Sequence, residues 1–294
     1  MALLVGYSPH KDDLGALDLA CQFARSDRVA VHALSVVPQS WPTPVAGDTD
    51  RDFEQWVAAQ GATAASAAGE HLASHDDVEG EASWVAGRSV PQTLLDRATT
   101  LGADLIVVGS GDQIAHGQVG TTTKTDRLLH SSDVPIAIAP RGYHAEPGTT
   151  VDRITLAFRG DDATWSLLHR VADIAKRTDA TLRVVTFAIR GRTMYPHTIS
   201  GAEDMVLAAW VEQARTDQAE ARDRLHDLGF TDDTLTFEVP VGRSWGAAID
   251  SLQWGSGDVL VVGSSSTHKL SHVFLGSSSA KIVRHAPVPV VVVP

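Results

Sequence analysis

The sequence has a single cysteine, Cys21, among its 294 residues. One thiol excludes an intramolecular disulfide and a metal site built from several thiolates. Cys21 lies in an apolar helical pattern, so we interpret it as a small buried hydrophobic residue rather than a reactive group. No metal site is evident either: His268 and His272 lie four positions apart, but no third ligand is near them in the sequence.

The chain also lacks long apolar runs and clusters of basic residues. No apolar run approaches the roughly 20 residues that a membrane-spanning helix needs, and the N-terminal residues are too few and uncharged for a signal peptide. The net charge is −12, whereas nucleic acids and anionic membranes bind clustered Lys and Arg. We therefore expect a cytoplasmic protein that binds neither nucleic acid nor membrane.

The sequence does contain an alternation of strands and helices that occurs twice. In the first half we expect strands at 3–5, 29–36, 81–86, 104–108 and 135–139, and helices at 12–25, 53–74, 90–101 and 121–130. In the second half we expect strands at 154–158, 181–187, 234–239, 258–262 and 289–294, and helices at 162–177, 203–228, 245–254 and 276–284. This alternation predicts an α/β fold with a parallel, doubly wound sheet in each half.

The two halves also match residue by residue. The segment DLIVVGS at 104–110 corresponds to DVLVVGS at 258–264, and GRS at 87–89 corresponds to GRS at 242–244. A repeat of this length indicates a duplicated domain rather than a solenoid. We predict a first domain at 1–141, a linker at 142–151 and a second domain at 152–294, each with five strands in the order 3-2-1-4-5.

The last strand of each half is apolar on both faces, as in the segment PVVVVP at 289–294. In the expected strand order this fifth strand lies at an edge of the sheet, and a bare apolar edge promotes aggregation. We therefore expect the two domains to pair with each other through their fifth strands. The sequence leaves open whether two chains form a homodimer.

Small residues follow the fourth strand of each half, where ligands of doubly wound sheets bind. In the second half these residues are Gly263, Ser264, Ser265 and Ser266, followed at the next helix by Gly276, Ser277 and Ser278. In the first half they are Gly109, Ser110 and Gly111, followed by Gly120, Thr121 and Thr122. Backbone N–H groups and a helix N-terminus in such a loop favour an anion site. The alternative is that the Ser and Thr clusters at 121–123 and 277–279 are only helix N-caps.

This spacing resembles the nucleotide signature of the universal stress proteins, here in a tandem form that covers essentially the whole chain. The signature is Gly, two residues, Gly, nine residues, then Gly with Ser or Thr. The second half keeps this spacing with Ser266 in place of the middle glycine, whereas the first half has Asp112 there and a gap of seven residues. The resemblance implies a Rossmann-like fold that holds ATP or AMP, with its phosphates on this loop. It also implies an acid after the first strand, where this sequence has Ser8 and Arg159.

We therefore expect an adenine-nucleotide-binding protein with a role in a stress response, in which the second half is the better site. No Walker lysine follows Gly263, and no general base or set of metal-binding carboxylates is evident, so we expect at most weak ATP hydrolysis. The alternative is a scaffold that binds a protein partner and whose nucleotide sites have decayed. The missing acids and Asp112 favour this second interpretation.

Overall fold

The structure is a computed structural model that describes residues 2–8, 13–39, 48–190, 202–264 and 275–294. It separates into two compact units, Met1–Thr150 (unit 1) and Val151–Val293 (unit 2). The domain boundaries at 141 and 152 stay a prediction.

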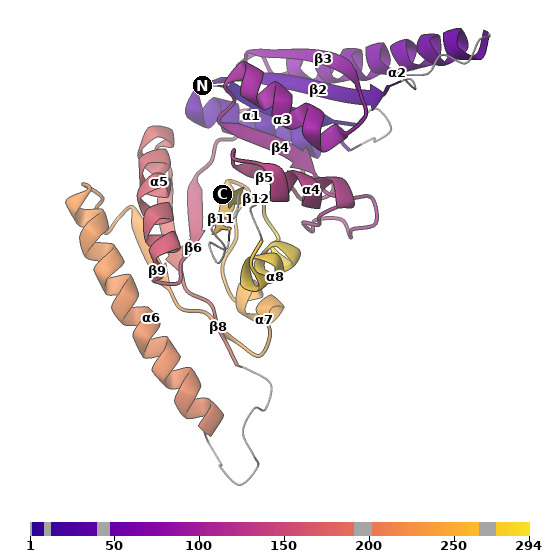
Figure 1. Cartoon of the computed structure of the whole chain (residues 1–294). Helices are drawn as coiled ribbons and strands as arrows, with labels where there is room; N and C mark the ends of the chain where they lie inside the picture. The colour runs from indigo at the N-terminus through magenta and orange to yellow at the C-terminus, as the bar shows by residue number, and fades with distance from the viewer. Residues whose placement is uncertain (1, 9–12, 40–47, 191–201, 265–274) are drawn as a thin grey trace. The chain divides into compact units, whose positions relative to one another are not determined.

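Unit 1 is an α/β domain with one parallel sheet (Figure 1). Its elements are β1 Ala2–Tyr7, α1 Gly15–Asp27, β2 Ala30–Pro38, α2 Asp48–Ala73, β3 Gly80–Gly87, α3 Val90–Leu101, β4 Leu105–Gly109, α4 Thr123–Ser131 and β5 Ile136–Ala139. The strands pair in parallel in the order β3-β2-β1-β4-β5, which confirms the predicted fold class and strand order. This order places the ends of β1 and β4 side by side at the centre of the sheet.

Helices cover both faces of this sheet. Helices α1 and α2 pack against each other and on one set of strands, while α3 packs on β1, β2 and β4 and also contacts α4. The central strands are buried along their middle residues, with Leu4, Val5, Ile106 and Val107 each 0 % exposed. Strands that are apolar on both sides are typical of a parallel sheet that is covered by helices on both faces.

Unit 2 repeats this architecture with small differences. Its elements are β6 Arg153–Ala157, α5 Asp162–Thr178, β7 Thr181–Val185, β8 Ala188–Ile189, α6 Ala202–Asp227, β9 Leu235–Glu238, β10 Val241–Gly242, α7 Trp245–Asp250, β11 Asp258–Gly263, α8 Ser277–His285 and β12 Val290–Val293. The main sheet is parallel in the order β9-β7-β6-β11-β12. The duplication predicted from the sequence is therefore present in the fold.

Two predicted elements of unit 2 differ from the structure. The strand expected at 181–187 ends at Val185, and β8 pairs with β10 as a separate two-stranded sheet. Pro240 lies between β9 and β10 and has no N–H to donate, which interrupts the ladder at this point. The helix expected at 245–254 ends at Asp250. Beyond this point the carbonyl of Ile249 accepts from the backbone N–H of Leu252 (3.2 Å) and from the indole N–H of Trp254 (3.0 Å).

Three further expectations concern Cys21, membrane-spanning helices and the pairing of the last strands. Cys21 is buried, as predicted. No helix in the described part of the chain is both long and apolar enough to cross a membrane. The pairing of the fifth strands, β5 and β12, stays a prediction.

Candidate functional site

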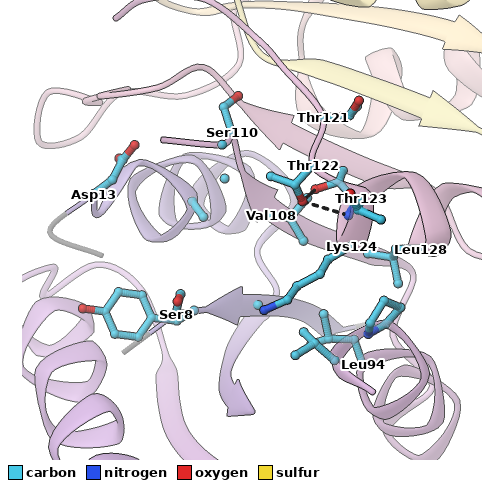
Figure 2. A pocket seen from close by; sticks show the side chains of 18 of the residues that line it. Ser8, Asp13, Leu94, Val108, Ser110, Thr121, Thr122, Thr123, Lys124 and Leu128 are labelled. Atoms are coloured by element: carbon cyan, nitrogen blue, oxygen red, sulfur yellow. Dashed lines mark hydrogen bonds between the residues drawn. The ribbon is translucent and has the colours of Figure 1, made fainter. Parts of the chain in front are cut away.

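Unit 1 contains a cavity of about 660 Å³ at the carboxyl ends of β1 and β4 (Figure 2). Its wall is formed by residues that follow β1, by the loop that follows β4 and by the first turn of α4. Of the residues predicted for the first-half site, Ser8, Gly109, Ser110, Gly111, Thr121 and Thr122 line this cavity. Parallel strands bring these segments together because their carboxyl ends meet at one edge of the sheet.

Ser110 holds the loop after β4 in place. Its hydroxyl donates to the carbonyl oxygen of Ala139 (2.7 Å) and accepts from the backbone N–H of Gly120 (3.0 Å). The residue is only 2 % exposed. Ser110 therefore joins the two ends of the loop to β5, and this explains why a small hydroxyl residue follows the strand.

Two glycines of this loop are required by close packing within the protein. A Cβ atom on Gly111 would lie 2.8 Å from Cγ2 of Thr122, and one on Gly120 would lie 2.3 Å from Cγ1 of Ile114. Gly109 is different, because its nearest neighbour would be Cβ of Ala16 at 3.9 Å, an ordinary contact. The glycine spacing of the first half is thus explained partly by the packing of the loop.

The N-terminus of α4 faces this cavity. Thr122 is the N-cap residue, and its hydroxyl accepts from the backbone N–H of Thr125 (3.1 Å). The N-cap interpretation is therefore confirmed for Thr122, which also lines the cavity. Neighbouring N–H groups and the helix dipole give this end of α4 a partial positive charge.

Lys124 is a site residue that the sequence analysis missed. It lies in the first turn of α4 and lines the cavity. Figure 2 shows its side chain extending from α4 toward the side of the cavity where Ser8 lies. The sequence did show a lysine three positions after Thr121, at the start of a predicted helix. The direction of the Lys124 side chain, however, depends on how the preceding loop folds.

Asp13 is a second residue that was missed. Ser8 stands where an acid was expected, yet Asp13, a few residues further along, also lines the cavity. One carboxylate oxygen accepts from the N–H of Gly15 (2.9 Å) and the other from the N–H of Gly142 (3.0 Å). Two backbone donors thus fix the position of this acid, and Asp112 adds a second carboxylate to the wall.

Much of the remaining wall of the cavity is apolar. It is formed by side chains from β2, α3, β4 and α4, namely Leu34, Val36, Val90, Leu94, Val108 and Leu128. A cavity with a largely apolar wall and a few polar groups on one side is typical of small-molecule sites, which span about 300–1,000 Å³. The cavity therefore brings Lys124 and the N-terminus of α4 together with a largely apolar surface.

The corresponding loop of unit 2 is described only at its two ends. Ser264 donates its backbone N–H to the carbonyl of Val293 (2.8 Å), and Ser279 donates its hydroxyl to the carbonyl of Gly263 (2.9 Å). The N-cap residue of α8 is Gly276, which has no side chain that could accept a hydrogen bond. Ser277 and Ser278 follow in the first turn. The serines at 277–279 are therefore not N-caps, which corrects that alternative. Ser265, Ser266, His268 and His272 lie outside the described residues.

Arg159 follows β6 and interacts with a neighbouring acid. Its guanidinium Nε lies 3.7 Å from Oδ2 of Asp161, and the side chain is 61 % exposed. Its backbone N–H donates to the hydroxyl of Thr164 (3.4 Å). The position where the resemblance implied an acid is therefore occupied by Arg159, and the nearby Asp161 serves as the N-cap of α5.

The fold and the cavity define a class: duplicated α/β domains with a ligand-type cavity at the strand ends of the parallel sheet. The family model described as the universal stress protein family matches residues 1–140 and again 150–294. The chain therefore belongs to the universal stress protein family, in its tandem form.

Individual relatives agree with this assignment. The chain is 36 % identical to universal stress protein Rv2319c of Mycobacterium tuberculosis over 296 residues, which cover 100 % of both proteins. Two solved structures share the fold over 99 % of this chain. One is a universal stress protein from Archaeoglobus fulgidus, with a TM-score of 0.58, 16 % identity and 97 % of that chain covered. The other is protein PA1789 from Pseudomonas aeruginosa, with a TM-score of 0.59, 18 % identity and 92 % of that chain covered.

Proposed function

We propose that this protein binds an adenine nucleotide, ATP or AMP, in the cavity of unit 1. The observation that carries the proposal is the placement of Lys124 and the N-terminus of α4 in one cavity with an apolar wall from β2 and α3. Membership of the family supports the class of ligand. The proposed role is nucleotide binding in a stress response, without strong catalysis.

The phosphates would lie at the start of α4. There the helix dipole favours negative charge, and Thr121 lines the same part of the wall. The Lys124 ammonium, which reaches from α4 toward Ser8, would contact the phosphates from the side nearer the adenosine. The chain as a whole carries a net charge of −12, so local groups rather than the long-range field must attract the ligand. This arrangement needs no Walker lysine.

The adenosine would lie between the ends of β1 and β4. Ser8 and Asp13 line this side, and both carboxylate oxygens of Asp13 already accept one backbone hydrogen bond. A carboxylate oxygen has a second lone pair, so Asp13 can still accept from a ribose hydroxyl. The apolar side chains of Val36 and Leu94 would contact the purine ring.

A second nucleotide site in unit 2 is part of the same proposal. The N-terminus of α8 contains Gly276, Ser277 and Ser278. Ser277 and Ser278 correspond to Thr121 and Thr122, which immediately precede α4. The spacing of the second half matches the family signature better than that of the first. We therefore expect this half to contribute to binding as well.

Calorimetry on the full chain with ATP and with AMP tests the proposal. In Lys124→Glu we expect the affinity to fall by roughly 10- to 100-fold, the value of a charge-assisted hydrogen bond. The matched control is Arg127→Glu, which makes the same charge change on an exposed position of α4 outside the cavity. Gly276→Glu tests the site of unit 2 in the same way.

The outcomes separate the two interpretations. No binding by the wild type at millimolar nucleotide would refute the proposal and favour a partner-binding scaffold. The carboxylate of Asp112, in the loop proposed to hold the phosphates, is an observation that supports this alternative. Binding that is equally strong in Lys124→Glu, Gly276→Glu and the control would show that the nucleotide lies elsewhere.

A further inference from the structure

Asp18 is a buried carboxylate on α1 that is surrounded by histidines. The residue is 2 % exposed. Its Oδ1 atom lies 2.7 Å from Nε2 of His71, near the end of α2, and its Oδ2 atom lies 2.8 Å from Nδ1 of His144. None of these residues lines the cavity described above.

His75 completes the cluster and has an unused ring nitrogen. Its side chain is 9 % exposed, and its Nε2 atom lies 3.9 Å from Oδ1 of Asp18, too far for a hydrogen bond. Among the described residues this buried Nε2 atom has no hydrogen-bond partner. A buried polar atom without a partner is unfavourable, and this one faces a carboxylate and a second imidazole, the groups that bind transition metals.

We propose that Asp18, His71 and His75 form a binding site for a divalent transition-metal ion of the Zn²⁺ type. Each of the three residues offers one ligand atom, and these atoms lie within 4.8 Å of one another. We assign them as Oδ1 of Asp18 and Nε2 of both histidines, because Oδ1 lies 2.7 Å from Nε2 of His71 and 3.9 Å from Nε2 of His75. Tetrahedral Zn²⁺ with bonds of about 2.0–2.1 Å places its ligand atoms roughly 3.4 Å apart. The two distances to Oδ1, 2.7 Å and 3.9 Å, lie on either side of that value.

The donor set defines the kind of ion. Imidazole nitrogen and one carboxylate suit Zn²⁺ and its neighbours, whereas Ca²⁺ and Mg²⁺ prefer oxygen ligands throughout. A water molecule would take the fourth position. His144 donates to the other carboxylate oxygen and would orient Asp18, as partners of metal-binding groups commonly do.

Binding also requires a change of tautomer at both histidines. Nε2 of His71 donates to the Asp18 carboxylate, which can only accept, so this proton must move to Nδ1 of His71 before the ion binds. Nδ1 of His75 lies 2.9 Å from a guanidinium nitrogen of Arg25, which can only donate, so the proton of the neutral His75 ring lies on Nε2. When the ion takes Nε2, the proton moves to Nδ1 and the contact with Arg25 ends. Arg25 keeps its other partners, the carboxylate of Asp77 and the carbonyl of Thr149.

The test is Zn²⁺ titration of the full chain, freed of metal by a chelator, with calorimetry as the readout. The expected result is one ion bound at this cluster, and an affinity at least about tenfold lower in His75→Gln. The matched control is His169→Gln, which removes an exposed histidine of α5 in unit 2 and should leave this binding unchanged. Asp18→Asn should weaken it as well, because the amide replaces the charge.

A second readout guards against variants that fold poorly. Co²⁺ bound to the wild type should give the strong visible absorption of a four-coordinate site, and His71→Gln should lose it while the circular dichroism of the protein stays the same. The proposal is overturned if the wild type takes up no Zn²⁺ at millimolar concentration. It is also overturned if folded His75→Gln binds as tightly as the wild type, because the ion then lies elsewhere.

Discussion

Buried charges in this protein are balanced by residues that are distant in the sequence. Arg183 of β7 is 1 % exposed, and its guanidinium donates to the hydroxyl of Thr155 (3.0 Å) and the carbonyl of Gln253 (2.7 Å). It also lies over the ring of Trp254, 4.4 Å from the centroid. Burial lowers the pKa of Arg183. Asp18 is the corresponding case in unit 1, where histidines supply the partners.

The Asp18 cluster predicts that acid destabilises the metal-free protein. Burial, with the charges of His71 and Arg25, lowers the pKa of His75 from its ordinary value of 6.5. As the pH falls through 6.5, the unfolded chain therefore takes up a proton at His75 before the folded protein does, and this favours unfolding. We expect the free energy of unfolding, measured with urea and a chelator, to fall between pH 7.5 and 5.5 by at most about 1.4 kcal/mol per pH unit.

His75→Gln is the variant that isolates this effect. It removes the titrating group, so its free energy of unfolding should change less with pH over the same range. Burial acts to raise the pKa of Asp18, but hydrogen bonds from His71 and His144 outweigh it and the pKa lies below its ordinary 3.8. The contribution of Asp18 is therefore lost only at lower pH, outside this window. Equal slopes for wild type and His75→Gln would contradict the assignment.

At the scale of one element, α4 and the loop before it form the polar side of the cavity. Ser110 joins the loop to β5, and Thr122 caps the helix. The cap gives α4 a defined start, and this start sets the direction of Lys124. The position of the cation therefore depends both on the cap within α4 and on the hydrogen bond that joins the loop to β5.

We expect Thr122→Ala to lower the free energy of unfolding by about 1 kcal/mol, the usual value of a helix N-cap. The reason is that the backbone N–H of Thr125 loses its acceptor. Urea unfolding measures the loss. Thr123→Ala, at the next and exposed position of the helix, is the matched control and should change stability much less. An equal loss in both variants would show that capping is not the cause.

At the scale of the whole molecule, two copies of one fold each end in a strand that is rich in valine, alanine or isoleucine. Strand β5 follows β4 in unit 1, and β12 follows β11 in unit 2. The prediction that these strands pair rests on the cost of leaving an apolar edge exposed. It concerns the arrangement of the two units, which only an experiment on the intact chain decides.

Amide hydrogen exchange tests this pairing. In an edge strand of a parallel sheet alternate N–H groups face the solvent, whereas a strand paired on both sides has all of them bonded. If β5 and β12 are paired with each other, the amides of both strands should exchange slowly throughout. Fast exchange at every second residue of both strands would refute the pairing. The central strands β1 and β6 provide the reference for full protection.

Much of the fold follows from the sequence because its signals are local. Apolar strands, helical periodicity and the repeated DLIVVGS pattern depend on neighbouring residues, and they predicted the class, the duplication and the strand order. The errors fell at the ends of elements. Pro240, which is distant from β7 in the sequence, interrupts the ladder of that strand. At the end of α7 the indole of Trp254 takes the carbonyl of Ile249, a side-chain contact that periodicity does not reveal.

The site was less predictable, because side-chain direction is not a local property. The sequence by itself determined the family, the loops that follow β4 and β11 and the small residues within them. Only the tertiary structure placed Lys124 and Asp13 in one cavity and brought Asp18 to His71, His75 and His144. The physical reason is that a parallel sheet gathers the ends of distant strands at one edge, and helix packing joins side chains that no spacing in the sequence relates.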